Sequence, residues 1–187
     1  MGKALIVVDV QVDFCEGGAL GVEGGNRVAA EVAELLAGDH GYDAVVATRD
    51  HHIDPGTHFS DQPDFVDTWP PHCVVGTPGQ ELHPDLRGYG FDAVFDKGSY
   101  EAAYSGFEGS IGGAEGGERL AAWLGRNAIT EVDVVGIATD YCVRATARDA
   151  ALEGFETTVL SNLTAAVHPD SFAAVEADLA GDRVAWA

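Results

Sequence analysis

The sequence predicts an α/β protein with a doubly wound, mainly parallel sheet and helices on both faces. Short valine-rich apolar segments recur along the chain, and several are separated by segments whose apolar residues have helical spacing. This alternation indicates a parallel sheet, because parallel neighbours need long crossover connections that usually contain a helix. With 187 residues, 46% of them hydrophobic, a single domain over residues 1–187 accounts for the chain.

The first strand is predicted at residues 4–10, a valine-rich segment that is apolar except for Asp9 and is of the kind buried on both faces of a parallel sheet. Later segments of similar length and composition predict the remaining strands, at residues 43–48, 91–95, 132–137 and 157–160, with a short edge strand at 183–186. Apolar residues at helical spacing predict helices at 26–37, 115–126, 139–153 and 169–179. Two aperiodic segments remain, 54–84 and 98–117, and irregular segments of this length are usually functional.

Charge and cysteine content exclude several classes of partner. The 31 acidic residues outnumber the 10 basic ones and give a formal net charge of −21, which repels nucleic acids and anionic membranes and mildly favours a neutral small-molecule substrate. The apolar segment near the N-terminus is broken at Asp9 and is too short for a signal peptide or a membrane span, so we expect a cytoplasmic protein. Three cysteines, Cys15, Cys73 and Cys142, do not form a disulfide framework, and reduced thiols are expected.

Four of the seven histidines lie between residues 51 and 72, and this clustering in a predicted loop indicates a metal site. The spacing of Asp50 and His52 directs both side chains to the same side, and a turn at Pro55-Gly56 brings His58 back toward them. His72 can complete the set, whereas His51 is one residue out of phase. The candidate ligands are therefore Asp50, His52, His58 and His72, which suit zinc, iron or manganese. The alternative is a polar loop with scattered surface histidines.

A candidate nucleophile, Cys142, lies in the first turn of a predicted helix, where unpaired N–H groups and the helix dipole favour a thiolate. Such a nucleophile needs a proton acceptor, and Asp9 at the end of the first strand fits that role, although it can equally be a turn former. Lys97 follows another predicted strand and would stabilise both groups as a fixed cation, or would simply be solvated. Because reactive side chains gather beyond the carboxyl ends of parallel strands, we expect Asp9, Asp50, Lys97 and Cys142 in one pocket.

These motifs together resemble the isochorismatase-like cysteine hydrolases, and within them the nicotinamidases. The resemblance covers nearly the whole chain through DVQVDF at 9–14, RDHH at 49–52, WPPHC at 69–73, KG at 97–98, AYSGF at 103–107 and GIATDYCVR at 136–144. It implies a six-stranded, mainly parallel sheet, a catalytic triad of Asp9, Lys97 and Cys142, and one divalent metal ion, zinc first, with iron or manganese as alternatives.

The resemblance also implies an activity, which is the deamidation of nicotinamide and pyrazinamide-like analogues through a thioester on Cys142, as part of pyridine-nucleotide salvage. It implies a cis peptide between Ile137 and Ala138 and an oxyanion hole formed by the N–H groups of Ala138 and Cys142. The substrate ring would contact Phe14, Trp69, Tyr104 and Tyr141, although Trp69 can instead be plain core. A carbamoyl or other small amide as substrate, a catalytically silent binder of pyridine carboxamides, and association into homo-oligomers stay open.

Overall fold

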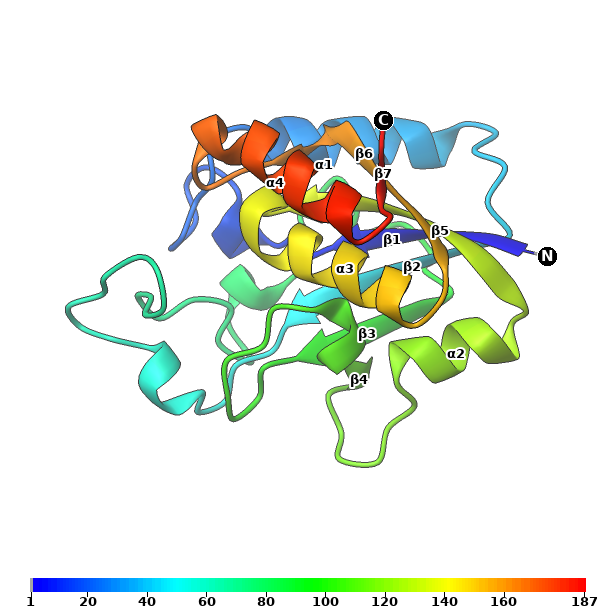
Figure 1. The fold of residues 1–187 in the computed structure, drawn as a ribbon. Coiled ribbons are helices and arrows are strands. Elements are labelled where there is room, and N and C mark those ends of the chain that lie inside the picture. The colour runs from blue at the N-terminus through cyan, green and yellow to red at the C-terminus, as the bar shows by residue number, and fades with distance from the viewer. Residues whose placement is uncertain (1) are drawn as a thin grey trace.

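The computed structural model describes residues 2–187, and these form a seven-stranded sheet with the strand order β4-β3-β2-β1-β5-β6-β7 (Figure 1). All neighbouring strands pair in parallel except β3 and β4, which are antiparallel. The strands are β1 (Gly2–Val8), β2 (Ala44–Asp50), β3 (Ala93–Lys97), β4 (Ser110–Ile111), β5 (Ile129–Ile137), β6 (Glu156–Ala165) and β7 (Ala185–Trp186). The predicted doubly wound α/β class is confirmed.

The expected number of six strands is wrong by one. The additional strand is β4, which has only two residues and lies within the glycine-rich segment 98–117. Two residues are too few to produce a periodic apolar pattern, and the strand is held by its antiparallel pairing with Phe95 and Asp96 of β3. The predicted edge strand near the C-terminus is present as β7, which pairs in parallel with β6.

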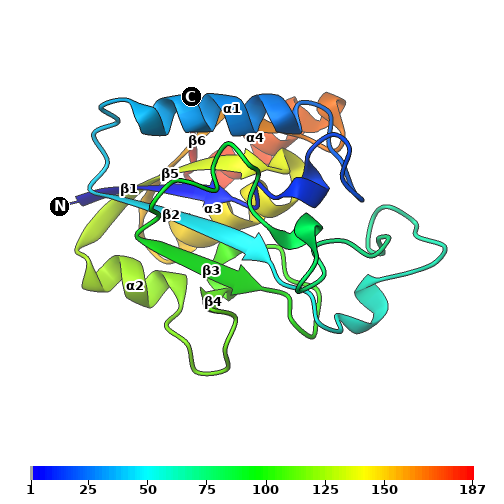
Figure 2. The same cartoon turned by 180° about the vertical axis from the view of Figure 1, so that it is seen from behind.

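Helices cover both faces of the sheet (Figure 2). They are α1 (Gly25–Ala37), α2 (Leu120–Arg126), α3 (Arg144–Leu152) and α4 (Phe172–Gly181). Leu5 and Val7 of β1 pack in the apolar layer that contains α1, whereas Ile6 and Val8 point to the layer formed with the other three helices. This alternation follows from the two-residue repeat of a strand, and it explains why β1 is apolar throughout.

The helix predicted at 115–126 begins at Leu120 in the structure. Gly116 has a φ of 80° and Gly117 donates a hydrogen bond to the carbonyl of Ala114, so the preceding residues form a turn instead of a helix. Among residues 2–187, no helix combines the length and the apolar character needed to cross a lipid bilayer.

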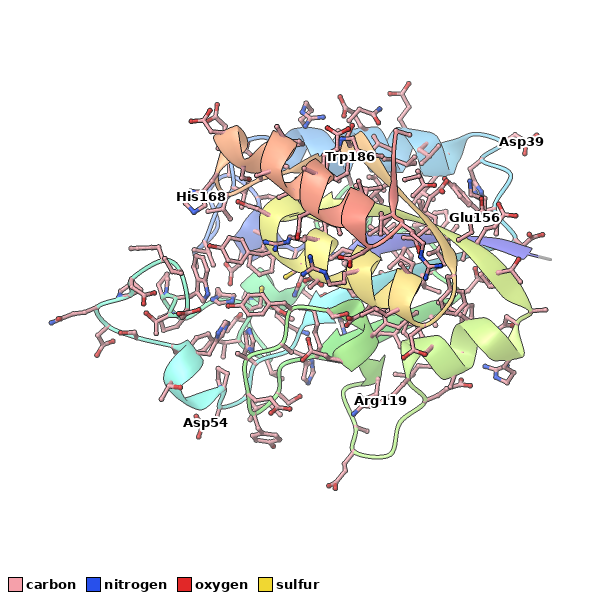
Figure 3. All side chains as sticks on the ribbon, viewed as in Figure 1. Asp39, Asp54, Arg119, Glu156, His168 and Trp186 are labelled. Atoms are coloured by element: carbon pink, nitrogen blue, oxygen red, sulfur yellow. The ribbon has the colours of Figure 1, made fainter. Side chains whose placement is uncertain are left out.

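The strand order places a topological switch point at β1. The chain builds β2 and β3 on one side of β1 and then returns to build β5 and β6 on the other side. In open α/β sheets, ligands bind beyond the carboxyl ends of the strands at such a point. Figure 3 shows Asp54 and His168, which follow β2 and β6, at that end of the molecule, and Asp39 and Glu156 at the opposite end.

Candidate active site

The carboxyl ends of four strands bring the predicted reactive side chains to one edge of the sheet. Asp9 follows β1, Asp50 ends β2 and Lys97 ends β3, while Cys142 lies in a single π-helical turn, Thr139–Val143, that connects β5 to α3. Each of these four residues is buried, with at most 7% of its surface exposed. The expected convergence of these side chains is therefore present in the structure.

Lys97 is the centre of the buried charged group. Its Nζ lies 2.9 Å from Asp9 Oδ2 and 3.8 Å from Cys142 Sγ. It also donates hydrogen bonds to Asp50 Oδ1 and, at 3.0 Å, to the carbonyl of Ala103. Burial by itself would lower the pKa of Lys97, but the carboxylates of Asp50 and Asp9 outweigh it and hold the pKa well above the usual lysine value. Lys97 is therefore a fixed cation shared by two carboxylates and a thiol.

The two carboxylates have opposite pKa shifts. Burial raises the pKa of Asp9 above its ordinary value, and the attraction of Lys97 offsets this only in part. Burial also acts to raise the pKa of Asp50, but the Lys97 ammonium and the neighbouring rings of His52 and His72 reverse the shift, so that its pKa lies well below the ordinary value. Asp50 is thus held as an anion, whereas Asp9 is the carboxylate that can exchange a proton.

The expectation that the helix terminus favours a Cys142 thiolate is wrong. Burial raises the pKa of Cys142 well above the ordinary thiol value; Lys97 opposes the shift, while the negative charges of Asp9 and Asp50 increase it. Helix-end dipoles act at the surface with about 0.3–1 kcal/mol, which is too little to overcome full burial beside two carboxylates. The Cys142 thiol therefore needs a base, and the candidate is the Asp9 carboxylate, which contacts the same Lys97 ammonium as the thiol.

Thr48 was not predicted as a site residue, yet it holds the candidate base. Its hydroxyl donates a hydrogen bond of 2.5 Å to Asp9 Oδ1, and this bond lowers the pKa of Asp9 against the larger effect of burial. Oδ2 of the same carboxylate remains directed at Lys97. The sequence contains a usable signal, because Thr48 lies two residues before Asp50 on β2, and alternate strand residues share a face.

Three histidines of the irregular loop form a cluster that suits a metal ion. One ring nitrogen from each of His52, His58 and His72 lies within 4.8 Å of the others, and all three side chains are buried. Oδ2 of Asp50 lies 3.4 Å from His52 Nε2 and 3.6 Å from His72 Nε2. The four predicted ligands are thus grouped, and their nitrogen and carboxylate donors are those of zinc, iron or manganese sites.

The orientation of the rings supports this assignment. His52 Nδ1 donates to the carbonyl of Gly98 at 2.6 Å and His72 Nδ1 to that of Pro70 at 2.8 Å, which leaves the lone pair on each Nε2. His52 Nε2 and His58 Nδ1 are buried without a hydrogen-bond partner. Burial, reinforced by the two neighbouring histidines, lowers the pKa of His58 to about 4, so its ring is neutral. Buried, unpaired and neutral nitrogens of this kind fit a divalent metal ion.

His51 takes no part in the cluster, as predicted. Its Nδ1 contacts Gln80 Nε2 at 3.1 Å and lies 3.7 Å from Asp96 Oδ2, and neither of these residues belongs to the histidine cluster. The predicted turn at Pro55-Gly56 is also present, with Gly56 at a φ of 60°. It starts a short 3₁₀ turn, Gly56–His58, which places His58 beside His52.

The candidate site opens into a pocket with aromatic walls. The pocket encloses about 430 Å³ including its open mouth, and Cys142, Asp50, His58 and His72 contribute to its lining. All four predicted ring-contacting residues, Phe14, Trp69, Tyr104 and Tyr141, also line it. A pocket of this size and largely apolar lining suits a small ring-containing molecule.

The aromatic side chains of the wall support one another. Trp69 Nε1 donates to the Tyr104 hydroxyl at 3.2 Å, and the Tyr141 ring packs edge-on against Trp69 with centroids 5.2 Å apart. Phe14 contacts the ring of His72 at a centroid distance of 5.4 Å. Trp69 is only 3% exposed, so it is buried and lines the pocket at the same time.

Sequence reasoning missed several apolar residues of the pocket, namely Leu20, Val22, Ala103 and Val167. Val167 follows the end of β6 and shares the position rule that identified Asp9 and Cys142. Ile137 and Ala138, at the end of β5, line the pocket next to Cys142, and the peptide bond between them is cis, as the resemblance implies. Cys15 and Cys73 are buried free thiols outside the pocket lining.

A doubly wound sheet that gathers a buried cysteine, an aspartate and a lysine beside a histidine cluster defines a cysteine hydrolase. Comparison with known proteins agrees: the isochorismatase domain matches residues 3–186, and the chain belongs to the isochorismatase family. It is 55% identical to the nicotinamidase/pyrazinamidase of Mycobacterium tuberculosis over 169 residues, which cover 90% of this chain and 89% of the relative.

Two solved structures of similar proteins share the fold over the whole chain. The pyrazinamidase of Pyrococcus horikoshii in complex with zinc is 34% identical, with a TM-score of 0.84 and coverage of 100% of this chain and 99% of that one. The protein PnC1 of L. infantum in complex with nicotinate is also 34% identical, with a TM-score of 0.86 and coverage of 100% and 92%.

Proposed function

We propose that this chain is a metal-dependent cysteine amidohydrolase that deamidates nicotinamide and pyrazinamide-like analogues to the carboxylic acid and ammonia. One observation carries the proposal: the ammonium of Lys97 contacts a thiol, a carboxylate of raised pKa and a carboxylate of the histidine cluster at the edge of an aromatic pocket. The relatives named nicotinamidase and pyrazinamidase, and the zinc and nicotinate in similar structures, support the same activity.

The acylation step uses Cys142 as nucleophile and Asp9 as base. The Asp9 carboxylate removes the Cys142 proton, and the thiolate attacks the carboxamide carbon of the substrate. The backbone N–H groups of Ala138 and Cys142 donate hydrogen bonds to the developing oxyanion, since both residues line the pocket. Asp9 then returns the proton to the leaving nitrogen, and ammonia departs from the tetrahedral intermediate, which leaves the thioester on Cys142.

Deacylation repeats the proton transfers with water. The Asp9 carboxylate, ionised again, removes a proton from a water molecule that attacks the thioester carbon, and the proton passes to the Cys142 sulfur as the acid leaves. Lys97 stays charged throughout, and it stabilises whichever of the two partners, thiolate or carboxylate, is negative at each stage.

Asp50, His52, His58 and His72 would hold the metal ion, for which we propose zinc, with iron or manganese as alternatives. When bound, the ion supplies a Lewis-acid docking point for the ring nitrogen of the substrate. Phe14, Trp69, Tyr104 and Tyr141 would enclose the ring from the sides. We also propose that residues 1–187 act as one hydrolase domain on a neutral amide, in keeping with the net charge of −21.

The test is ammonia release from nicotinamide by the purified protein, before chelation, after chelation and after zinc is restored, with elemental analysis of each sample. Release that chelation removes and zinc restores is the expected result. Pyrazinamide and a carbamoyl amide are assayed in parallel. Hydrolysis of the carbamoyl amide alone would overturn the substrate assignment, and binding of nicotinamide without ammonia release would identify a silent binder instead of an enzyme.

A further inference from the structure

Gln11 is a fully buried amide that binds the backbone of the candidate metal ligand Asp50. Its Oε1 accepts a hydrogen bond of 2.8 Å from the Asp50 N–H, and its Nε2 donates one of 2.9 Å to the Asp50 carbonyl. The second hydrogen of Nε2 is donated to the carbonyl of Gln80 at 2.8 Å. Gln11 therefore makes three hydrogen bonds, two of them to a single residue, with none of its surface exposed.

These bonds continue the sheet where its backbone pairing stops. The register between β1 and β2 ends at Val8 and Thr48, and the last backbone bond runs from the Asp9 N–H to the Thr48 carbonyl. Asp9 has a φ of 48°, which turns the chain away from β2. The Gln11 side chain then provides the donor and acceptor that a further strand residue would have offered to Asp50.

The position of Asp50 matters more than that of its neighbours, because its carboxylate has two sets of partners. Oδ1 accepts from Lys97, and Oδ2 lies 3.4 Å and 3.6 Å from the ring nitrogens of His52 and His72. On the β3 side, Asp50 is anchored by its register with Lys97. On the β1 side, the main chain has turned away after Asp9, and Gln11 supplies both hydrogen bonds to the Asp50 backbone.

We infer that Gln11 is a positioning residue for the metal site, which fixes the Asp50 backbone so that its carboxylate meets the histidine cluster. The inference rests on the metal site of the proposed function and adds a residue that touches neither metal nor substrate. Replacing a residue that hydrogen-bonds to a metal ligand typically weakens metal affinity by about 10- to 100-fold. A merely structural role would lower the stability of Gln11 variants without changing how tightly the folded protein binds zinc.

The experiment measures zinc affinity by competition with a chromogenic chelator, together with the thermal midpoint of the metal-free protein and its increase on zinc addition. Gln11→Met keeps the shape of the side chain and removes all three hydrogen bonds. Gln11→Glu keeps the acceptor for the Asp50 N–H but places an oxygen against the carbonyls of Asp50 and Gln80. Gln80→Met is the matched control, because this glutamine is also buried and its side-chain amide hydrogen-bonds to His51, which is not a candidate ligand.

Both Gln11 variants are expected to bind zinc about 10- to 100-fold more weakly and to show a smaller zinc-induced rise in midpoint, whereas Gln80→Met binds like wild type. If Gln11→Met does not fold, Gln11→Glu decides the question. Wild-type zinc affinity in a folded Gln11 variant overturns the inference, as does failure of both variants to fold. Absence of zinc binding by the wild-type protein would instead overturn the metal site of the proposed function itself.

Discussion

Asp50 and Lys97 are register partners in the parallel pairing of β2 and β3, and their side chains form an ion pair within the buried site. Partners in a parallel register present their side chains on the same face of the sheet. The link between the metal-binding loop and the candidate nucleophile is therefore made by the sheet itself. Because Lys97 also contacts Asp9 and Cys142, one strand pair sets the spacing of both halves of the site.

Replacing Lys97 with methionine is expected to abolish activity and to destabilise the fold by about 3–5 kcal/mol, because two buried carboxylates lose the cation that they share. The alkylation rate of Cys142 by iodoacetamide should also fall, since Lys97 opposes the rise of the thiol pKa. Urea unfolding and timed alkylation measure the two effects. An unchanged alkylation rate would remove Lys97 from the mechanism.

Lys3 provides the matched control, because it is the other lysine of the chain. It pairs with Asp133 at 2.8 Å, but its side chain is 40% exposed. Asp133 itself is buried but keeps a hydrogen bond of 2.6 Å from the Tyr42 hydroxyl. Because the Lys3 ammonium is largely solvated, Lys3→Met should cost less stability than Lys97→Met and leave both activity and alkylation unchanged. A loss similar to that of Lys97→Met would show that the effect is not specific to the site.

Cys142→Ala should reduce ammonia release by at least about a thousandfold, because no other group can form the thioester. Fold and zinc content should be retained, since Cys142 is not among the candidate ligands. Cys15→Ala is the control: Cys15 is also a buried thiol, and burial, with the nearby Glu16 and Asp85, raises its pKa to about 12. Comparable activity in Cys142→Ala and wild type would contradict the nucleophile assignment.

Much of the site could be predicted because its residues obey positional rules. Asp9, Asp50, Lys97 and Cys142 each stand at or just after a strand end, where the topology must bring them together. The ionisation state of Cys142 was not predictable in the same way, because it depends on burial and on carboxylates that approach only in the folded chain. Local sequence shows the helix terminus and not these neighbours.

Gln11 shows a second limit of sequence reasoning. It lies two residues beyond Asp9, and a glutamine there is compatible with an ordinary turn. Its role depends on Asp50, 39 residues away in sequence, which reaches it through the β1–β2 pairing. Strand β4 was missed for a related reason, because its two residues are defined by pairing with β3 and not by a pattern of their own.

Gly98→Ala should weaken zinc binding, because Gly98 lies against a candidate ligand. A Cβ added there would come within 2.7 Å of His52 Cε1, at a φ of 76° that favours glycine. The variant must displace the His52 ring or the loop that holds it. Equilibrium competition with a chelator measures the affinity. Wild-type affinity in a folded Gly98→Ala protein would show that the His52 ring does not need this close packing.

Gly41→Ala separates backbone strain from this contact. Gly41 has a similar φ of 70°, but a Cβ added there would meet nothing within 4 Å. Both variants should lose about 1–2 kcal/mol of folding stability, because alanine is strained in the left-handed backbone conformation. Only Gly98→Ala should lose zinc affinity as well, and an equal loss in Gly41→Ala would assign the effect to stability alone.

Thr48→Val should move the acid limb of kcat/KM to higher pH. The hydroxyl of Thr48 lowers the pKa of Asp9, so its removal leaves burial less opposed and raises that pKa further. Asp9 must be ionised to accept the thiol proton, so activity rises with pH through the Asp9 pKa, and a higher pKa shifts the limb upward. Thr48→Ser, which keeps the hydroxyl, should restore the wild-type profile. A limb that stays in place in Thr48→Val would separate Thr48 from the base.

Tyr141→Ala should raise KM for nicotinamide and change kcat much less, because Tyr141 lines the pocket as part of its aromatic wall and has no proposed part in the proton transfers. Its ring packs on Trp69 and on Tyr104, at centroid distances of 5.2 Å and 5.9 Å. An aromatic contact between Tyr141 and the substrate ring would contribute about 0.5–1.5 kcal/mol, which corresponds to a rise in KM of roughly 2- to 12-fold when the ring is removed. Tyr141→Phe keeps the ring and should behave like wild type if packing is what matters. A large fall in kcat with unchanged KM for Tyr141→Ala would instead place Tyr141 in the chemical step, and a defect in Tyr141→Phe would assign the effect to its hydroxyl.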